Sequence, residues 1–483
     1  MIVTGPGDVE QLLGVPKLAS GTGQAQAGAV IECLDDWNLR SKIKGLCFDT
    51  TSSNTGRHSG ACTLIEKALE QNVLYFACRH HVMEIVLEKV FTALKITAAS
   101  SGPDIALFKR FKEHWPYIDQ ACFETAAGME ELQSFKDVTV QFALKNLEIC
   151  HPRDDYREVL ELALIFLGAT PARGVHFQAP GALHHARWMA KIIYCYKMWM
   201  FKSQFKLKPS EEHGIFKFLL FVSDLYIPVW FEAPMPTAAP ANDLRLLQKL
   251  AKYPSTEVKH AATVAFCRHL WYLSEVMVGL AFFDVNLEPQ LKAQMVRNMH
   301  ENDGSVNPTP RLEAHLAQCN WADKELSSFV TTKTKLFFQN LGIPDSFLET
   351  PVETWNDNEC YTDAERIVKS LKVVNVNVNV FVHHAMQLLQ DVTQSYLYEN
   401  FTIQPLSSDV PEDVLVEYQL DSQWTHFENV RHRLGPQSIS RTCLVIFNKR
   451  RGGETAWLLH SAYTQHPRRE DVCLLYTSPS PRD

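Results

Sequence analysis

The chain has 483 residues, more than one ordinary hydrophobic core accommodates, so we expect two or three structural units. Hydrophobic residues make up 46% and charged residues 21%, a balance typical of a folded protein and unlike that of a disordered one. The formal net charge of −8 argues against nucleic-acid binding by the whole surface and restricts such binding to a local basic patch.

Cysteine usage and the first residues indicate a cellular compartment. The 12 cysteines occur singly, without a Cys-x-x-Cys pair, so a small secreted disulfide scaffold is not expected and a reducing, intracellular location is. The start, MIVTGPGDVEQ, lacks the features of a signal peptide. The most apolar window, 215–231, contains Lys217, Asp224 and Pro228, which favours a buried helix over a membrane span.

The first hundred residues alternate between strand and helix patterns. Residues 1–7 are typical of a strand end followed by a glycine turn, and 22–40 carry apolar residues at helical spacing. A short apolar run at 43–48 and another at 73–77 predict buried strands, with a helix over 60–70 between them. A further helix is expected to begin at Cys78.

Asp49 ends the strand predicted over 43–48, and the polar turn TTSSN follows it. A carboxylate at the carboxyl end of a core strand is well placed to bind a ligand or a metal ion. Alternatively, Asp49 accepts hydrogen bonds from the turn, as aspartates at turns commonly do. The spacing leaves both interpretations open.

The motif Cys78-Arg79-His80-His81 opens the helix after the second strand. Cys78 and His81 have the spacing of half a zinc site, and His58 and Cys62 could supply the other half. However, Cys62 also fits the apolar face of its helix, and buried cysteine is usually a small hydrophobic residue. We favour Cys78 and His81 as a structural brace, with His81 buried and hydrogen-bonded where the helix meets the sheet.

From residue 104 to about 335 the pattern is helical, and it contains a basic, aromatic segment at 187–208. Arg187, Lys191, Lys202 and Lys206 could contact DNA phosphates while the aromatic residues stack on bases. The alternative is a core helix whose lysine stems extend to solvent. We favour the core helix because the aromatic residues occur all around it.

The last part of the chain changes character twice. Residues 363–372 predict a helix, and the strict alternation VVNVNVNVFV at 373–382 predicts a strand. Residues 395–483 lack sustained periodicity and predict an irregular tail, whose final residues, LLYTSPSPRD, are not typical of an evolved protein.

Two motifs resemble those of hAT-type transposase-derived proteins: IKGLCFDTTSSNTGRHSGAC and ACRHHVMEIVL. The similarity continues through APGALHHARWMAKIIYCYKMWMF, HLWYLSEVMVGLAFFD and ERIVKSLKVVN, over roughly residues 1–375. The resemblance implies an α/β plus α fold, in which a large helical insertion interrupts an RNase H-like core. We therefore expect core residues at 1–100 and 346–394, the insertion at 101–345 and the tail at 395–483.

The resemblance also implies a chemistry. Such enzymes cut DNA with three acids, Asp, Asp and Glu, that hold two Mg²⁺ or Mn²⁺ ions. Asp49 matches the second aspartate, a catalytic and metal-binding residue, while Cys78 and His81 match the family's Cys-x-x-His. The implied partners are DNA and a second copy of the chain, the implied compartment is the nucleus, and no membrane is involved.

The other two acids depart from the family pattern. The first strand and its aspartate are expected to be absent, because the acids before residue 30 are Asp8 and Glu10, in a predicted loop and helix start. The glutamate expected after KVVN is replaced, since Asn375 precedes VNVNVFVHH, and Glu365 comes too early. The sequence therefore predicts an inactive remnant that binds DNA or a protein partner.

Two alternatives remain. One is an active, metal-dependent nuclease that combines Asp49 with Glu365 or Asp391. The other is a non-enzymatic scaffold stabilised by Zn²⁺ at His58, Cys62, Cys78 and His81, which we consider the weaker interpretation.

Overall fold

A computed structural model describes residues 1–5, 9–14, 16–97, 104–149, 154–181, 188–313, 320–374, 444–445 and 474–475. The described part of the chain is mostly helical and includes one small sheet. The chain divides into two compact units. Unit 1 consists of Met1–Cys78 and Thr334–Asp483, and unit 2 consists of Arg79–Lys333.

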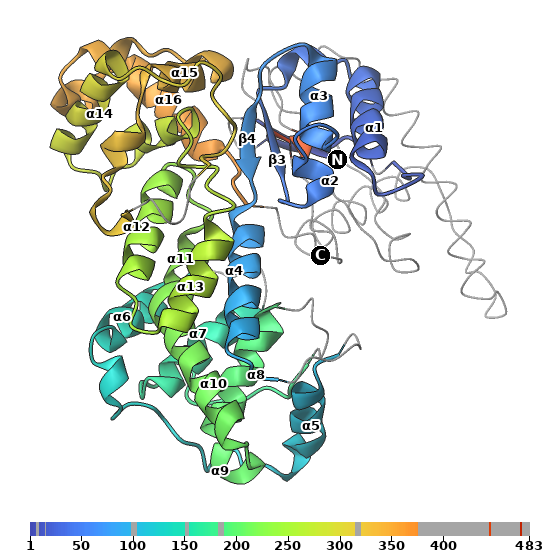
Figure 1. The fold of residues 1–483 in the computed structure, drawn as a ribbon, viewed down its shortest axis with the longest axis vertical. Helices are drawn as coiled ribbons and strands as arrows, with labels where there is room; N and C mark the ends of the chain where they lie inside the picture. Colours follow the sequence, from blue (N-terminus) through green and yellow to red (C-terminus); the bar gives the residue numbers. More distant parts are fainter. Residues whose placement is uncertain are drawn as a thin grey trace, which may run out of the picture. The chain divides into compact units, whose positions relative to one another are not determined.

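Unit 1 is built around β3 (Gly45–Phe48) and β4 (Leu74–Ala77), which pair in parallel with Leu46 opposite Tyr75. Every residue of both strands is buried, as expected for continuous apolar runs in a parallel pair. The helices α1 (Gly23–Asp36) and α3 (Ala61–Leu69) pack against each other beside these strands (Figure 1). The strands predicted over 43–48 and 73–77 and the helices predicted over 22–40 and 60–70 are thereby confirmed.

The rest of the sheet comes from both ends of the chain. β1 (Ile2–Gly5) and β2 (Val9–Leu12) form an antiparallel hairpin. The strand order is β2-β1-β5-β3-β4, where β5 is the two-residue segment Leu444–Val445, and β6 (Leu474–Leu475) pairs with β1. Glu10 therefore lies in a strand, and the prediction of a helix start there is wrong.

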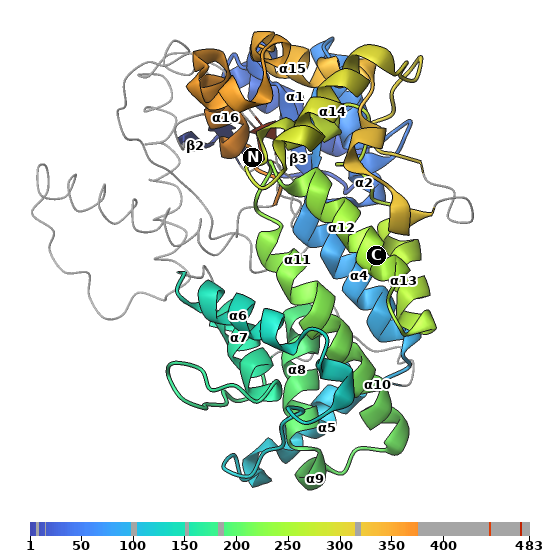
Figure 2. The ribbon, with the colours of Figure 1, turned by 90° about the vertical axis from the view of Figure 1, so that its left-hand side faces the viewer.

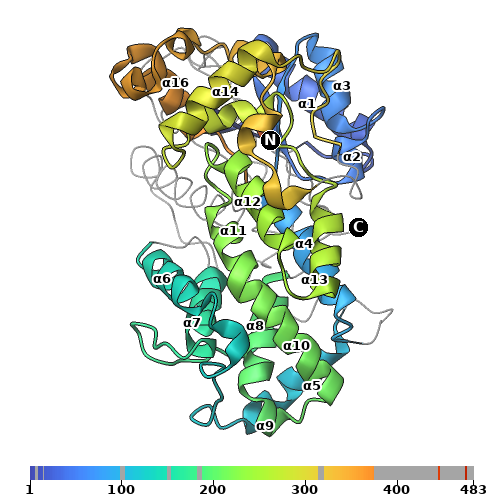
Figure 3. The same ribbon diagram turned by 60° about the vertical axis from the view of Figure 1, so that its left-hand side comes forward.

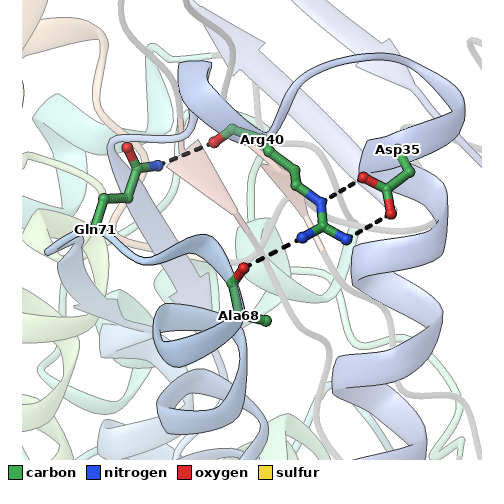
Figure 4. Close-up of polar contacts among 4 residues, drawn as sticks. All are labelled: Asp35, Arg40, Ala68 and Gln71. Atoms are coloured by element: carbon green, nitrogen blue, oxygen red, sulfur yellow. Dashed lines mark hydrogen bonds and ion pairs between the residues drawn. The ribbon is translucent and has the colours of Figure 1, made fainter.

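Arg40 connects the end of α1 to the end of α3 (Figure 4). Its guanidinium forms a two-pronged ion pair with Asp35, in which Nη2 lies 2.6 Å from Oδ2, and Nη1 donates to the carbonyl of Ala68. Gln71 donates to the carbonyl oxygens of Arg40 (3.0 Å) and Ile43 (2.8 Å). These bonds fix the chain where it enters β3.

The remaining elements of unit 1 follow unit 2 in sequence: α15 (Lys335–Leu341), the 3₁₀ turns Ser346–Glu349 and Val352–Asp357, and α16 (Glu359–Ser370). The Asn358 side chain caps α16 by accepting from the N–H groups of Cys360 and Tyr361. The helix predicted over 363–372 is thus confirmed and begins earlier. The strand predicted over 373–382 lies outside the described residues from 375 onward.

Unit 2 is helical throughout its described residues, as the sequence predicts (Figures 2 and 3). α4 (Arg79–Ala93) packs along α13 (Thr256–Phe266), and α12 (Ala239–Ala251) packs on α13. The other helices are α5 (Ala106–His114), α6 (Lys136–Leu147), α7 (Asp154–Phe166), α8 (Trp188–Met200), α9 (Lys202–Phe205), α10 (Pro209–Phe221), α11 (Ile227–Glu232) and α14 (Pro289–Glu301).

The apolar window at 215–231 forms a nearly continuous helix in which a π turn, Val222–Tyr226, joins α10 to α11. The turn lies just before Pro228, which has no N–H for a helical hydrogen bond. By length and composition alone, Pro209–Glu232 is the one helix in the described part of the chain that could cross a membrane. In this structure 61% of its most apolar window is buried.

Candidate functional site around Asp49

Asp49 lies at the carboxyl end of β3, and Cys78 follows β4 at the same edge of the sheet. The Cys78 N–H donates to the carbonyl oxygen of Phe48 across a distance of 2.7 Å. Asp49 is fully buried and Cys78 is 1% exposed. The parallel strand pair therefore brings the two motifs together, as their positions after buried strands predict.

The turn after β3 surrounds the Asp49 carboxylate. Oδ1 accepts hydrogen bonds from the Thr51 N–H (3.1 Å), the Thr51 hydroxyl (2.6 Å) and Asn54 Nδ2 (2.7 Å). The turn itself is a one-turn helix, α2 (Ser52–Thr55), which the sequence did not indicate. These bonds show the turn-acceptor role that was one of the two interpretations of Asp49. A ligand-binding role stays a prediction.

Glycines make the tight loop around this carboxylate possible. A Cβ on Gly60 would lie 2.6 Å from the carbonyl oxygen of Gly56 and 2.7 Å from that of Asn54, well inside contact distance. Gly23, at the start of α1, meets the carbonyl oxygens of Ser53 and Ser59 just as closely. The Asn-Thr-Gly part of the motif therefore sets how the loop packs against α1.

The cysteines near Asp49 are buried thiols. Burial, reinforced by the charges of Asp49 and Glu66, raises the pKa of Cys62 well above its ordinary value. Burial likewise raises the pKa of Cys47, beside Cys78 and Cys62. Because thiolates are the form that binds metal ions, Cys62 and Cys47 are small hydrophobic residues in this arrangement.

The described residues do not fit either metal site considered from the sequence. No three His, Cys, Asp or Glu side chains among them come together in a way that could hold a metal ion. His58 is exposed, and His81 belongs to unit 2. Glu365, on α16, pairs with Lys369 at 2.8 Å. Asp8 and Asp391 lie outside the described residues.

Within unit 2, the start of α4 carries a buried ion pair that the sequence did not reveal. Arg79 Nη2 lies 2.5 Å from Asp243 Oδ1, and Arg79 Nη1 donates to the carbonyl of Ala233 (3.2 Å). Arg79 and Asp243 are each 2% exposed, and the guanidinium lies over the ring of Tyr272. Burial raises the pKa of Asp243, and the Arg79 charge opposes that rise. The pair joins α4 to α12.

His80 and His81 have different surroundings. The His80 ring stacks on Trp230 with 3.7 Å between ring centroids, and its Nε2 lies 3.1 Å from the Trp230 carbonyl oxygen. Burial lowers the pKa of His80 to about 3, so the ring is neutral and donates to that carbonyl. His81 is partly exposed and near His269. In unit 2, the stacked, hydrogen-bonded histidine at the helix start is His80, whereas the sequence interpretation chose His81.

Most of the basic residues proposed for DNA contact are occupied in unit 2. Lys191 is 4% exposed, with its amine over the Phe91 ring. Lys202 pairs with Glu212 (2.8 Å) and Glu124 (3.6 Å). Lys206 is exposed just after α9, and Arg187 lies outside the described residues. Since the described side chains from Met189 to Met200 are mostly buried, α8 is a core helix.

Lys197 shows how this core accepts a charge. The residue is fully buried, and its amine lies 2.5 Å from Glu158 Oε1 and 2.6 Å from the Gln178 carbonyl oxygen. Burial lowers the pKa of Lys197, and Glu158 opposes that change. A paired lysine of this kind holds α8 against α7 and is not presented to a ligand.

Comparison with known proteins adds no relative: the chain matches no protein-family model, no curated protein and no solved structure.

Proposed function

We propose that the chain derives from a hAT-type DNA transposase, that unit 1 is an RNase H-like core, and that the protein binds DNA without cleaving it. The interruption of unit 1 carries this proposal. Its residues come from Met1–Cys78 and from Thr334 onward, with the helical unit Arg79–Lys333 between them. The break falls directly after Cys78, within the Cys-x-x-His motif that the resemblance highlights.

The strand arrangement supports the same interpretation. An antiparallel hairpin, β1–β2, lies on one side of β5, and the parallel pair β3–β4 lies on the other. β5 runs antiparallel to β1 and parallel to β3. A core strand that is absent from the sequence would take the place between β1 and β3, where only two residues pair here.

The side chains around Asp49 support the absence of two-metal catalysis. Two-metal cleavage needs several carboxylates around the metal pair. In the described part of the structure, the Asp49 carboxylate is buried and bound by its own turn, and Glu365 is paired with Lys369. Asp49 alone cannot position two metal ions and an attacking water.

A nicking assay tests the loss of catalysis. Supercoiled DNA and an oligonucleotide with a 3′-hydroxyl are incubated with the protein in Mg²⁺ or Mn²⁺, beside the variant Asp49→Asn. We expect equal, background-level cleavage from both proteins. Cleavage by the wild type that Asp49→Asn abolishes would contradict the proposal and favour the active nuclease.

DNA binding is tested separately by fluorescence anisotropy with duplex and single-stranded oligonucleotides at several salt concentrations. Because a local basic patch must bind phosphates against a net charge of −8, we expect affinity that falls steeply with salt. No binding at low salt with protein in large excess would refute DNA binding.

A further inference from the structure

Two arginines in unit 2 meet beside the end of α13. Arg268 and His269 follow this helix, and Arg311 reaches them from a distant part of the sequence. Arg311 Nη1 donates to the Arg268 carbonyl oxygen (2.8 Å), and the Leu312 N–H donates to the Leu270 carbonyl oxygen (3.0 Å). The Arg311 guanidinium also lies over the Trp271 ring, 5.7 Å from its centroid. These contacts hold the Arg311 guanidinium in place.

Neither guanidinium is neutralised by a carboxylate. Arg79, Arg110 and Arg173 each form an ion pair with Asp243, Glu211 and Glu161, respectively. Across the described residues, Arg268 and Arg311 form no such pair. Arg268 is exposed and Arg311 is half-buried, so both positive charges remain accessible. An unpaired pair of arginines is notable in a chain whose net charge is −8.

His269 lies between these charges and has an unused ring nitrogen. Its Nδ1 is buried and, among the described residues, has no hydrogen-bond partner. Burial and the charges of His81, Arg311 and Arg268 lower the pKa of His269 to about 3. A neutral imidazole can carry its proton on Nδ1 and donate it to an oxygen acceptor. Buried polar atoms are normally paired, so a partner for Nδ1 is expected from outside the described residues.

We propose that Arg268, His269 and Arg311 form a site for a phosphate group, either free or in a nucleic-acid backbone. A guanidinium presents donors in a rigid fork that matches the oxygens of phosphate. Two such groups beside an imidazole donor provide positive charge and hydrogen bonds on one side of a tetrahedral oxyanion. The site is distinct from Asp49 and does not depend on the proposed function.

The test measures binding of two probes to the full chain. Calorimetry measures inorganic phosphate, and anisotropy measures a short fluorescein-labelled single-stranded oligonucleotide. The variants are Arg268→Gln, Arg311→Gln and the control Arg245→Gln, in which the altered arginine pairs with Glu232 elsewhere in unit 2. Charge-assisted hydrogen bonds contribute enough that losing one weakens binding about tenfold or more. We expect this loss in both test variants and unchanged binding in the control.

Each outcome decides the question. Binding of phosphate alone identifies a free-phosphate site, and tight, salt-dependent binding of the oligonucleotide identifies a nucleic-acid contact; both support the site if Arg268→Gln weakens them. Arg268 makes no side-chain contact that folding needs, so its variant remains informative even if Arg311→Gln is unstable. If neither probe binds, or if Arg268→Gln binds like the wild type, the proposal is overturned.

Discussion

Breaking the buried ion pair between Arg79 and Asp243 should destabilise unit 2 strongly. In Arg79→Met, the Asp243 carboxylate stays 2% exposed but loses its cation. Removing one partner of a buried pair typically costs ~3–5 kcal/mol, because the remaining charge is left without compensation. Arg79 also donates to the Ala233 carbonyl and lies over Tyr272, so we expect the upper part of that range.

The pH dependence of this loss has a definite sign. Burial already raises the pKa of Asp243, and Arg79 is the group that opposes the rise. Without Arg79 the folded-state pKa moves above the unfolded value, so the folded protein retains a proton that the unfolded chain releases. Stability is then lost as pH increases, and the penalty of Arg79→Met should be larger at pH 8 than at pH 5.

A double-mutant cycle measures the pair directly. Arg79→Met, Asp243→Leu and the double variant are unfolded in urea, while hydrogen exchange of α4 and α12 peptides identifies the unit that opens. We expect the double variant to lose less stability than the two single losses added together. Arg366→Met, which removes an exposed pair with Asp363, serves as the control and should change stability by about 0.5 kcal/mol or less. Additive losses, or single losses below about 1 kcal/mol, would refute the reasoning.

Three further predictions concern other parts of the fold. Because the pKa of His80 is about 3 when folded and near 6.5 when unfolded, unit 2 should lose up to ~1.4 kcal/mol per pH unit as pH falls from 6.5 toward 3; His80→Gln should reduce that slope, although His269 will preserve part of it. Gly60→Ala should destabilise unit 1 by ~1–3 kcal/mol in urea unfolding, because the added methyl meets backbone atoms, whereas Gly28→Ala has open space in α1 and should stabilise it by ~0.5–1 kcal/mol; equal effects would contradict the close packing. Ending the chain after residue 440 removes β5, so amide exchange in β1 and β3 should accelerate while exchange in α8 stays unchanged.

The sequence predicted the elements whose patterns are local. Two continuous apolar runs ending at Asp49 and Cys78 indicated β3 and β4, and helical spacing indicated α1 and α3. The core role favoured for α8 followed from aromatic residues on all its faces, and its burial bears this out. Local patterns were sufficient here because burial on every side leaves a mark on every residue.

Features that depend on distant partners could not be predicted. Arg79 and Asp243 are separated by 164 residues, and nothing near either residue signals the other. His80 and His81 are adjacent and identical, so only the rotation of α4 relative to Trp230 determines which ring stacks. The pairing of β5 also escaped prediction, because two residues are too few to show a strand period.

The interruption of unit 1 has a consequence for synthesis on the ribosome. β4 packs on α15, yet α15 follows the whole of unit 2 in the chain. At typical elongation rates, on the order of ten seconds or more pass between the emergence of the two segments. Until then the apolar faces of β3 and β4 lack part of their cover, and the nascent protein should be most dependent on chaperones during that interval.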